Sequence, residues 1–375
     1  MKRSIVMQFA FLGREVDDRR GYGLLAYRRI GLSFVLGWML PWGIAPLAVL
    51  AGSAQVVPEG VGAVAVTFAP LEYRRAWDNS RHAAPIGAEL VDQINAALGA
   101  DLIAGRYEAD YNFTVLDLYA GLTPRTTLHL QLPYFRGEVR QRVDVHAPPP
   151  LDHAILGQLE AMGIRAETLK GDGWGDAHVW LYHQYLETPR WTGTAGAGWR
   201  TCETATDFSH NTEKLNVGTR ESEAALFNHV VDFKLWSNAS LNYRFELQYP
   251  LEGSRDIFRP GEGVVSVRHT PGRYMTHELD LKTYWLGKRL TGTAGAWYRE
   301  ESAGRTDGVR DASGKDYLWG KLAVGYDGMT DYENGVLPIP IFVELRYWHL
   351  ESARNTLAYM DSYWEAWIAF PLWKW

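Results

Sequence analysis

Polar and apolar residues alternate one by one along several stretches of this chain. In the clearest stretch, residues 241–249, every odd position is apolar or aromatic and every even position is polar or charged. The same alternation marks residues 227–235, 278–285, 318–327 and 341–347. Because successive side chains of a β-strand point to opposite faces, this pattern predicts strands with one face in an apolar medium and the other in water.

The pattern and the turn residues between its stretches predict twelve strands. Their expected ranges are 61–74, 110–121, 125–138, 174–187, 190–202, 222–235, 239–251, 275–287, 289–301, 315–328, 337–349 and 359–375. Short connections alternate with long ones, apart from a connection of middling length at 328–336, as in barrels with short periplasmic turns and longer outer loops. We therefore predict an all-β fold, a transmembrane antiparallel up-and-down β-barrel of 12 strands, with 14 as the alternative count.

Two of the long outer loops have helical periodicity. One runs from Ile86 to Ala100, and the other from Leu151 to Leu169. The second loop has an apolar stripe consisting of Ile155, Leu156, Leu159 and Met162. An amphipathic helix must bury such a stripe. The stripe could lie in the barrel mouth as a gate, or it could pack on the other helix as a rigid cap beside the mouth.

Aromatic residues are abundant although the chain is not very apolar. It has 16 Trp and 20 Tyr, 22% charged residues and a mean hydropathy of −0.24. Interfacial aromatic girdles explain this combination. We assign to the girdles six residues near strand ends: Trp174, Trp191, Trp236, Trp285, Trp319 and Trp348. The aromatic end of the chain, Phe370 to Trp375, resembles the terminal strand that barrels offer to their assembly machinery, so Trp375 is the expected contact.

The N-terminal region is typical of a signal peptide. Arg28 and Arg29 precede an apolar stretch over 30–50, and small residues follow up to Ala54. We predict cleavage after Ala54, which leaves residues 55–375 as the barrel domain; an uncleaved anchor helix is the alternative. Removing residues 1–54 changes the net charge from −6 to −10. Such an acidic chain is not expected to bind nucleic acid.

The face that alternates with the apolar one carries both charge signs. Eleven residues are expected to line the lumen: Asp232, Lys234, Asn242, Arg244, Glu246, Gln248, Glu278, Asp280, Lys282, Glu344 and Arg346. They could form a pore, or a lattice of ion pairs that fills and stiffens the barrel. Strands ~4.8 Å apart and tilted by ~40° give a backbone diameter of about 24 Å, with on the order of 12 Å left inside the side chains. This size suits a small solute.

One region resembles a known family. It comprises residues 118–123, residues 128–133, a helical insertion, and Gly173, Gly175 and Asp176, which open the next strand. It is similar to the outer-membrane transporters grouped under the MetA pathway of phenol degradation, which are distantly similar to fatty-acid and toluene uptake channels. The resemblance covers about residues 112–250, and the rest only by architecture.

The resemblance implies a channel in the outer membrane of a Gram-negative bacterium for a small, hydrophobic or aromatic solute. No cofactor and no catalytic residue are implied, and the lipid bilayer and lipopolysaccharide are the expected surroundings. The chain departs from the fatty-acid channels because few residues between Gln55 and the first strand are left for an N-terminal plug.

Other readings stay open at this point. An outer-membrane hydrolase of the lipase or deacylase type would need Ser, His and an acid together at the rim, whereas the histidines are scattered over different strands. A structural barrel with no through-path is a further alternative. Residues 171–176 could bind calcium, although glycines that ease the chain into a strand explain them better. The hexapeptide at 192–197 recurs identically at 291–296, through either duplication or convergence.

Overall fold

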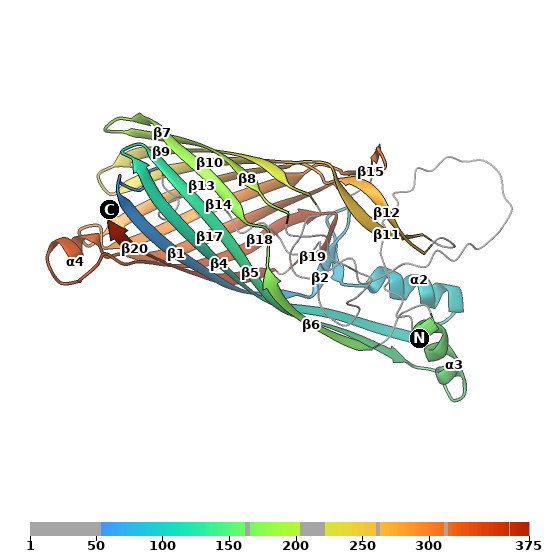
Figure 1. Ribbon diagram of the computed structural model, residues 1–375. Coiled ribbons are helices and arrows are strands. Elements are labelled where there is room, and N and C mark those ends of the chain that lie inside the picture. The colour runs from blue at the N-terminus through green and yellow to red at the C-terminus, as the bar shows by residue number, and fades with distance from the viewer. Residues whose placement is uncertain are drawn as a thin grey trace.

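The protein forms a closed antiparallel β-barrel (Figure 1). The computed structural model describes residues 54–161, 166–202, 222–259, 263–310, 314–359 and 361–374. The expected signal peptide up to residue 53, Met162 of the apolar stripe and Trp375 lie outside these ranges.

Twelve strands make up the barrel, as the sequence predicts. They are β1 (Val61–Tyr73), β4 (Ile103–Thr123), β5 (Thr126–Val145), β7 (His178–Glu187), β8 (Trp191–Arg200), β9 (Ala224–Trp236), β10 (Ala239–Pro250), β13 (Tyr274–Trp285), β14 (Leu290–Glu301), β17 (Lys315–Asp327), β18 (Phe342–Arg354) and β20 (Ser362–Lys374). Each strand pairs with its neighbours along the chain, and pairing of β1 with β20 closes the wall. Closure leaves no free edge within the lipid, where an unpaired backbone group is costly.

The expected facing of the strands is confirmed. On β10, the even positions Asn242, Arg244, Glu246 and Gln248 are 3–5% exposed, whereas Tyr249 on the other face is 59% exposed. The polar positions therefore point into the lumen and the apolar positions point outward.

Part of the wall rises above the rest of the barrel (Figure 1). β4 and β5 are 21 and 20 residues long and pair along their whole length. A further strand, β6 (Glu167–Trp174), pairs with the upper part of β5. The prediction that 75–109 and 139–173 are loops is therefore wrong in part. Alternation continues through these segments, but its sense is inverted: the outward positions Arg106, Glu108 and Arg140 are charged, whereas the inward side chains Ile103, Tyr107 and Val139 are apolar or aromatic and buried.

Two helices lie at the tip of this tall wall: α2 (Ala88–Leu98) and α3 (Leu151–Ala161). Both were expected, although α3 is shorter than predicted because β6 takes up the end of its loop. Ile155 and Leu159 of α3 are buried with Ile103 at the top of β4, and Ile94 of α2 packs against this cluster. The stripe therefore lies beside α2, as in the second arrangement left open above, and not in the barrel mouth. Leu156 is exposed.

The remaining elements are short and lie in connections. β2 (Arg75–Trp77), β3 (Ala83–Pro85) and β19 (Thr356–Tyr359) form one small outer sheet. A second consists of β11 (Gly253–Arg259), β12 (Gly263–Thr270), β15 (Arg305–Thr306) and β16 (Val309–Arg310). Helix α4 (Met329–Glu333) fills the inner connection of middling length. Within the described ranges, no helix is long and apolar enough to span a membrane.

The repeated hexapeptide makes room for large neighbours. A Cβ on Gly196 would lie 2.5 Å from the ring of Tyr182, and a Cβ on Gly295 would lie 1.9 Å from Asp280 Oδ1. Both glycines face the lumen beside a bulky inward side chain of the preceding strand. This shared steric need supports convergence as the origin of the repeat.

The facing of β10 gives a first prediction. Phe245→Arg places a charge on the outer face near mid-strand and is expected to lower the free energy of unfolding in lipid vesicles by about 2–4 kcal/mol. Thr276→Arg is the control, because Thr276 faces the lumen in register with Glu246 and should cost much less. Urea titration of both variants in vesicles gives the comparison. A larger loss for Thr276→Arg would contradict the assigned facing.

Candidate functional site

The candidate site is the lumen, where buried charges join neighbouring strands. At its centre, Arg244 Nη1 lies 3.0 Å from Glu278 Oε2. The Lys321 ammonium contacts both Glu278 and Asp280. Lys321 comes from β17 and the two carboxylates from β13, so the contact passes over β14, where Gly295 stands between Asp280 and Lys321 in register. A side chain at position 295 would block this contact.

A second group of charges lies on β18 and β20. The Arg346 guanidinium pairs with Glu344 of its own strand and with Glu365 of β20, and all three side chains are buried. It also lies 5.6 Å from the ring centroid of Trp367. Arg346 is thus held by two carboxylates and an aromatic face, which fixes its position in the wall.

A buried acid–histidine pair lies on β4 and β5. Asp117 Oδ1 lies 2.7 Å from His129 Nε2, and the Gln131 amide donates to the same carboxylate at 3.1 Å. Tyr119 stacks on the His129 ring with the centroids 4.3 Å apart. His129 Nδ1 has no hydrogen-bond partner in the described part of the chain. A hydrolase would need a serine or threonine hydroxyl at this nitrogen, and the described residues place none there.

The motif that carries the family resemblance lies where β6 ends and β7 begins, and its glycines lead the chain from one strand into the next, as expected. Gly175 N–H donates to the Pro133 carbonyl at 2.7 Å, which bridges the gap between β6 and β7. The next residue, Asp176, is fully buried, and Arg200 Nε lies 3.6 Å from its carboxylate. Gly173, in register with Phe135, belongs to β6. Among the described residues there is no cluster of side chains that could hold a metal ion, so the calcium reading gains no support.

Carboxylates outnumber cations among the buried side chains. The described chain buries nine acidic residues and five basic ones. The acidic ones are Asp117, Asp176, Glu246, Glu278, Asp280, Glu301, Asp316, Glu344 and Glu365; the basic ones are Arg200, Arg244, Arg299, Lys321 and Arg346. Asp316 lies on the outward side of β17 and pairs with Arg81 and Arg354. The other eight acidic residues still outnumber the five basic ones, and an interior with this excess of negative charge repels anions.

Aromatic side chains form the other large part of the inner surface. Toward the end with the tall wall, which we call the outer end, one buried cluster contains Phe113, Phe135, Trp297, Trp319 and Trp348. Toward the opposite end, where the turns are short, a second cluster includes Tyr119, Trp180, Tyr182 and Trp367. Five buried indole Nε1 atoms have no hydrogen-bond partner within the described ranges: that of Trp77, which packs against the outer cluster, and those of the cluster members Trp180, Trp297, Trp348 and Trp367.

Of the six tryptophans that the sequence assigns to the aromatic girdles, two lie inside the barrel instead. Trp174, Trp191, Trp236 and Trp285 are 44–65% exposed on the outside, as girdle residues should be. Trp319 and Trp348 are buried inside the barrel. Trp319 lies two positions from the inward charge Lys321, and Trp348 lies two positions from Arg346. Because residues two positions apart share a face of a strand, the alternation would have assigned both tryptophans to the lumen.

The segment before β1 lies in the mouth of the barrel that is opposite the tall wall. The Ala54 N–H donates to Asp232 Oδ2 at 2.7 Å, and the Thr194 hydroxyl donates to the Ala54 carbonyl. The Val57 N–H donates to Thr127 Oγ1 at 2.9 Å, and its side chain packs in the second aromatic cluster. Ala54 is the last residue before the predicted cleavage, so in the mature chain the segment is held by Val57. Its partner Thr127 lies on β5, two strands from β1, and its cluster includes Trp180 of β7 and Trp367 of β20.

All eleven residues expected to line the lumen occupy inward positions of their strands. Eight of them are buried: Asn242, Arg244, Glu246, Gln248, Glu278, Asp280, Glu344 and Arg346. Asp232 and Lys282 are half-buried, and Lys234 is exposed near the periplasmic end. The sequence did not single out Lys321, Glu365, Asp117 or Arg200, although Lys321 does alternate with apolar neighbours.

Comparison with known proteins establishes the fold. No family model and no curated protein matches the chain. Among solved structures, an outer membrane channel from Pseudomonas putida F1 aligns with a TM-score of 0.59 and 11% identity, over 87% of this chain and all of that one. The Ralstonia pickettii toluene transporter TbuX aligns with a TM-score of 0.37 and 8% identity, over 85% and 90% of the two chains. The first alignment shows that this chain has the fold of an outer membrane channel.

Proposed function

We propose that this protein is an outer-membrane channel that admits small, neutral, hydrophobic or aromatic solutes. The observation that carries the proposal is the inner wall of aromatic side chains, which extends from the outer cluster with Trp297 and Trp348 to the periplasmic cluster with Trp180 and Trp367. Apolar atoms on the lumen side are unusual for a barrel that conducts water and salts, whose interior is polar. They suit a solute with an apolar body.

The polar groups between the clusters define the rest of the solute. Four indole N–H groups in the clusters are free to donate, so a hydroxyl or carbonyl oxygen on the solute would satisfy a buried donor. The carboxylate excess works against an anionic solute. A compact ring with one neutral polar substituent fits both features, and a carboxylate-bearing analogue fits poorly.

The similarity in fold supports this reading, since the Pseudomonas putida protein is an outer membrane channel. The location in a Gram-negative outer membrane is part of the same proposal, as are the pore role of the lumen residues and delivery by the assembly machinery through Trp375. The short segment at 55–60 is proposed to restrict the periplasmic exit, because Val57 bonds to Thr127 of β5 and is buried in the cluster of Trp180 and Trp367 inside the barrel.

The proposal is tested by uptake into cells whose outer membrane contains the protein. A neutral aromatic alcohol is expected to enter severalfold faster than in cells without the protein, and the corresponding carboxylate is expected to gain much less. Trp367→Leu removes an inner aromatic and should reduce the gain. Trp364→Leu is the matched control on the same strand, because Trp364 is 54% exposed on the outer face.

Two results would count against the channel. Equal uptake with and without the protein, in cells where its heat-modifiable mobility shows that it has folded, would favour a barrel with no through-path. Release of acyl groups from membrane lipids, lost in His129→Ala, would favour the hydrolase instead.

A further inference from the structure

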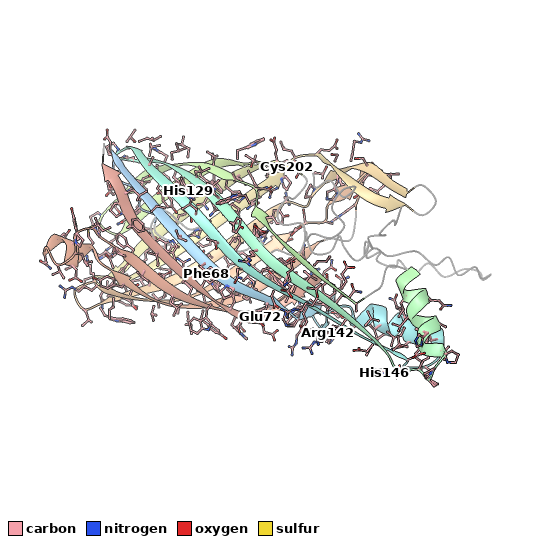
Figure 2. All side chains as sticks on the ribbon, turned by 60° about the horizontal axis from the view of Figure 1, so that its bottom comes forward. Phe68, Glu72, His129, Arg142, His146 and Cys202 are labelled. Carbon is pink, nitrogen blue, oxygen red and sulfur yellow. The ribbon has the colours of Figure 1, made fainter. Side chains whose placement is uncertain are left out.

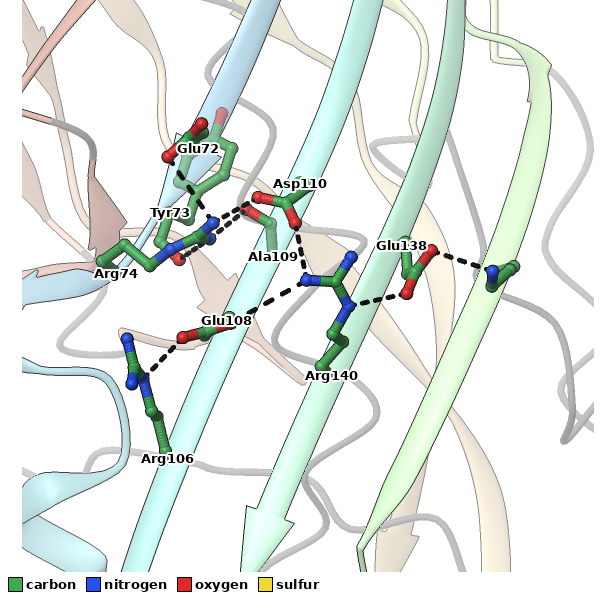
Figure 3. Close-up of polar contacts among 10 residues, drawn as sticks. Glu72, Tyr73, Arg74, Arg106, Glu108, Ala109, Asp110, Glu138 and Arg140 are labelled. Atoms are coloured by element: carbon green, nitrogen blue, oxygen red, sulfur yellow. Dashed lines mark hydrogen bonds and ion pairs between the residues drawn. The ribbon is translucent and has the colours of Figure 1, made fainter.

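A ladder of ion pairs crosses the outer face of the tall wall (Figure 3). Arg74 Nη2 lies 2.5 Å from Asp110 on β4, and Arg140 of β5 lies 3.4 Å from the same carboxylate. Arg140 also pairs with Glu138 at 2.7 Å, and Glu138 with Lys170 of β6 at 2.9 Å. The ladder therefore joins four neighbouring segments of the wall, from the end of β1 to β6.

The ladder lies just above the apolar belt of the barrel. Along the outer face of β5, Leu128, Leu130 and Leu132 are followed by Tyr134, whose ring meets that of Trp174 edge-on at 5.2 Å. Such aromatic pairs mark the boundary between hydrocarbon and head groups. The charges begin at the next outward position, Arg136. Figure 2 shows the same order along the wall, with Phe68 in the belt, then Glu72, then Arg142 and His146 toward the tip.

Two further cations flank the ladder. Among the described residues, neither Arg136 nor Arg142 forms an ion pair, and both are exposed. Asp172, which stands opposite Arg136 in the β5–β6 register, accepts a hydrogen bond from the Tyr134 hydroxyl. Arg142 stands directly opposite Arg106 in the β4–β5 register. Like charges in directly opposite positions destabilise a strand pair. Arg106 has one partner, Glu108, at 2.5 Å. An anion bound between the two arginines would offset the repulsion.

We propose that this surface, formed by Arg106, Arg136 and Arg142, binds the phosphorylated head group of lipopolysaccharide. Guanidinium groups form bidentate, charge-assisted hydrogen bonds with phosphate. The ladder carboxylates are occupied by Arg74, Arg140 and Lys170, which keeps them from repelling that anion.

The height of the arginines selects lipopolysaccharide over a phospholipid. Arg136 and Arg142 are six residues apart, which is about 20 Å along a strand and about 15 Å along the membrane normal at a tilt of ~40°. A phospholipid head group reaches only the lowest of these residues, whereas lipid A and its inner core carry anionic groups through this depth. The inference requires that the barrel stands in an outer membrane, but it does not depend on the barrel conducting any solute.

Binding to the whole protein tests the inference. The full chain, refolded in detergent without lipopolysaccharide, is titrated with rough lipopolysaccharide that carries both lipid A phosphates, and complexes are counted by native mass spectrometry. Arg106→Gln, Arg136→Gln and Arg142→Gln are combined in one variant. Loss of even one charge-assisted hydrogen bond corresponds to about a tenfold weaker affinity, so the variant should bind at least that much more weakly.

The matched control removes three exposed cations from the periplasmic turns: Arg125→Gln, Arg190→Gln and Lys288→Gln. It should bind like the unaltered protein. Dephosphorylated lipid A and phosphatidylglycerol are each expected to bind the unaltered protein at least about tenfold more weakly than the phosphorylated ligand. Arg142→Gln alone, near the tip of the wall, guards against loss of folding in the triple variant and should still weaken binding. Equal affinity of the arginine variants and the control, or phosphatidylglycerol binding as tightly as lipopolysaccharide, would overturn the inference.

Discussion

Replacing residues 55–59 with a glycine–serine linker of the same length is expected to raise single-channel conductance in planar bilayers severalfold. The linker removes Val57, which is 1% exposed and packs with Tyr119, Trp180 and Trp367 inside the barrel. Without this anchor, the segment loses most of what holds it in the periplasmic mouth. The barrel strands are unchanged, so insertion into the bilayer should be normal.

The control for this experiment keeps the anchor. Glu59→Gln alters an exposed residue of the same segment and should leave conductance unchanged. A linker variant that inserts normally with the conductance of the unaltered protein would show that the segment is not the restriction. The restriction would then lie in the charged centre of the lumen.

The strand pattern was the part of the fold that the sequence could predict. Alternation is a local property, and on β10 it holds over nine consecutive residues because one face meets an apolar medium and the other does not. The upper parts of β4 and β5 rise beyond that medium, so Arg106, Glu108 and Arg140 stand on their outer faces, while Tyr107 and Val139 are buried on the inner face. Above the apolar belt the alternation therefore continues with the polar face outward, and a search for outward apolar residues ends too early.

The site could be predicted as a face but not as a set of contacts. Parity alone places Glu278, Asp280 and Arg244 toward the lumen. Parity does not show that Lys321, two strands away, reaches both carboxylates, because that contact depends on a glycine in the strand between them. The position of residues 55–60 in the mouth of the barrel is likewise a matter of register and closure, which bring Thr127, Trp180 and Trp367 into the surroundings of Val57.

The charged centre gives the prediction with the largest expected effect on stability. Lys321→Met leaves Glu278 and Asp280 buried with Arg244 as their remaining cation. Removing one partner of a buried ion pair strands the other charge, and such changes typically cost about 3–5 kcal/mol. Urea titration of folding in lipid vesicles should show a loss of this size.

Two further measurements distinguish the loss of a countercharge from a simple loss of packing. Adding Asp280→Asn to Lys321→Met removes one stranded carboxylate and should restore part of the lost stability. The control is Lys282→Met alone, which should change the stability little because Lys282 is only half-buried. Lys321→Met also makes the lumen one charge more negative, so the reversal potential in a KCl gradient should shift toward that of a cation-selective pore. If Lys321→Met is as stable as the unaltered protein, then Lys321 does not balance the two carboxylates. In that case the lumen must satisfy them by water, and a wider aqueous path through the centre of the barrel would follow.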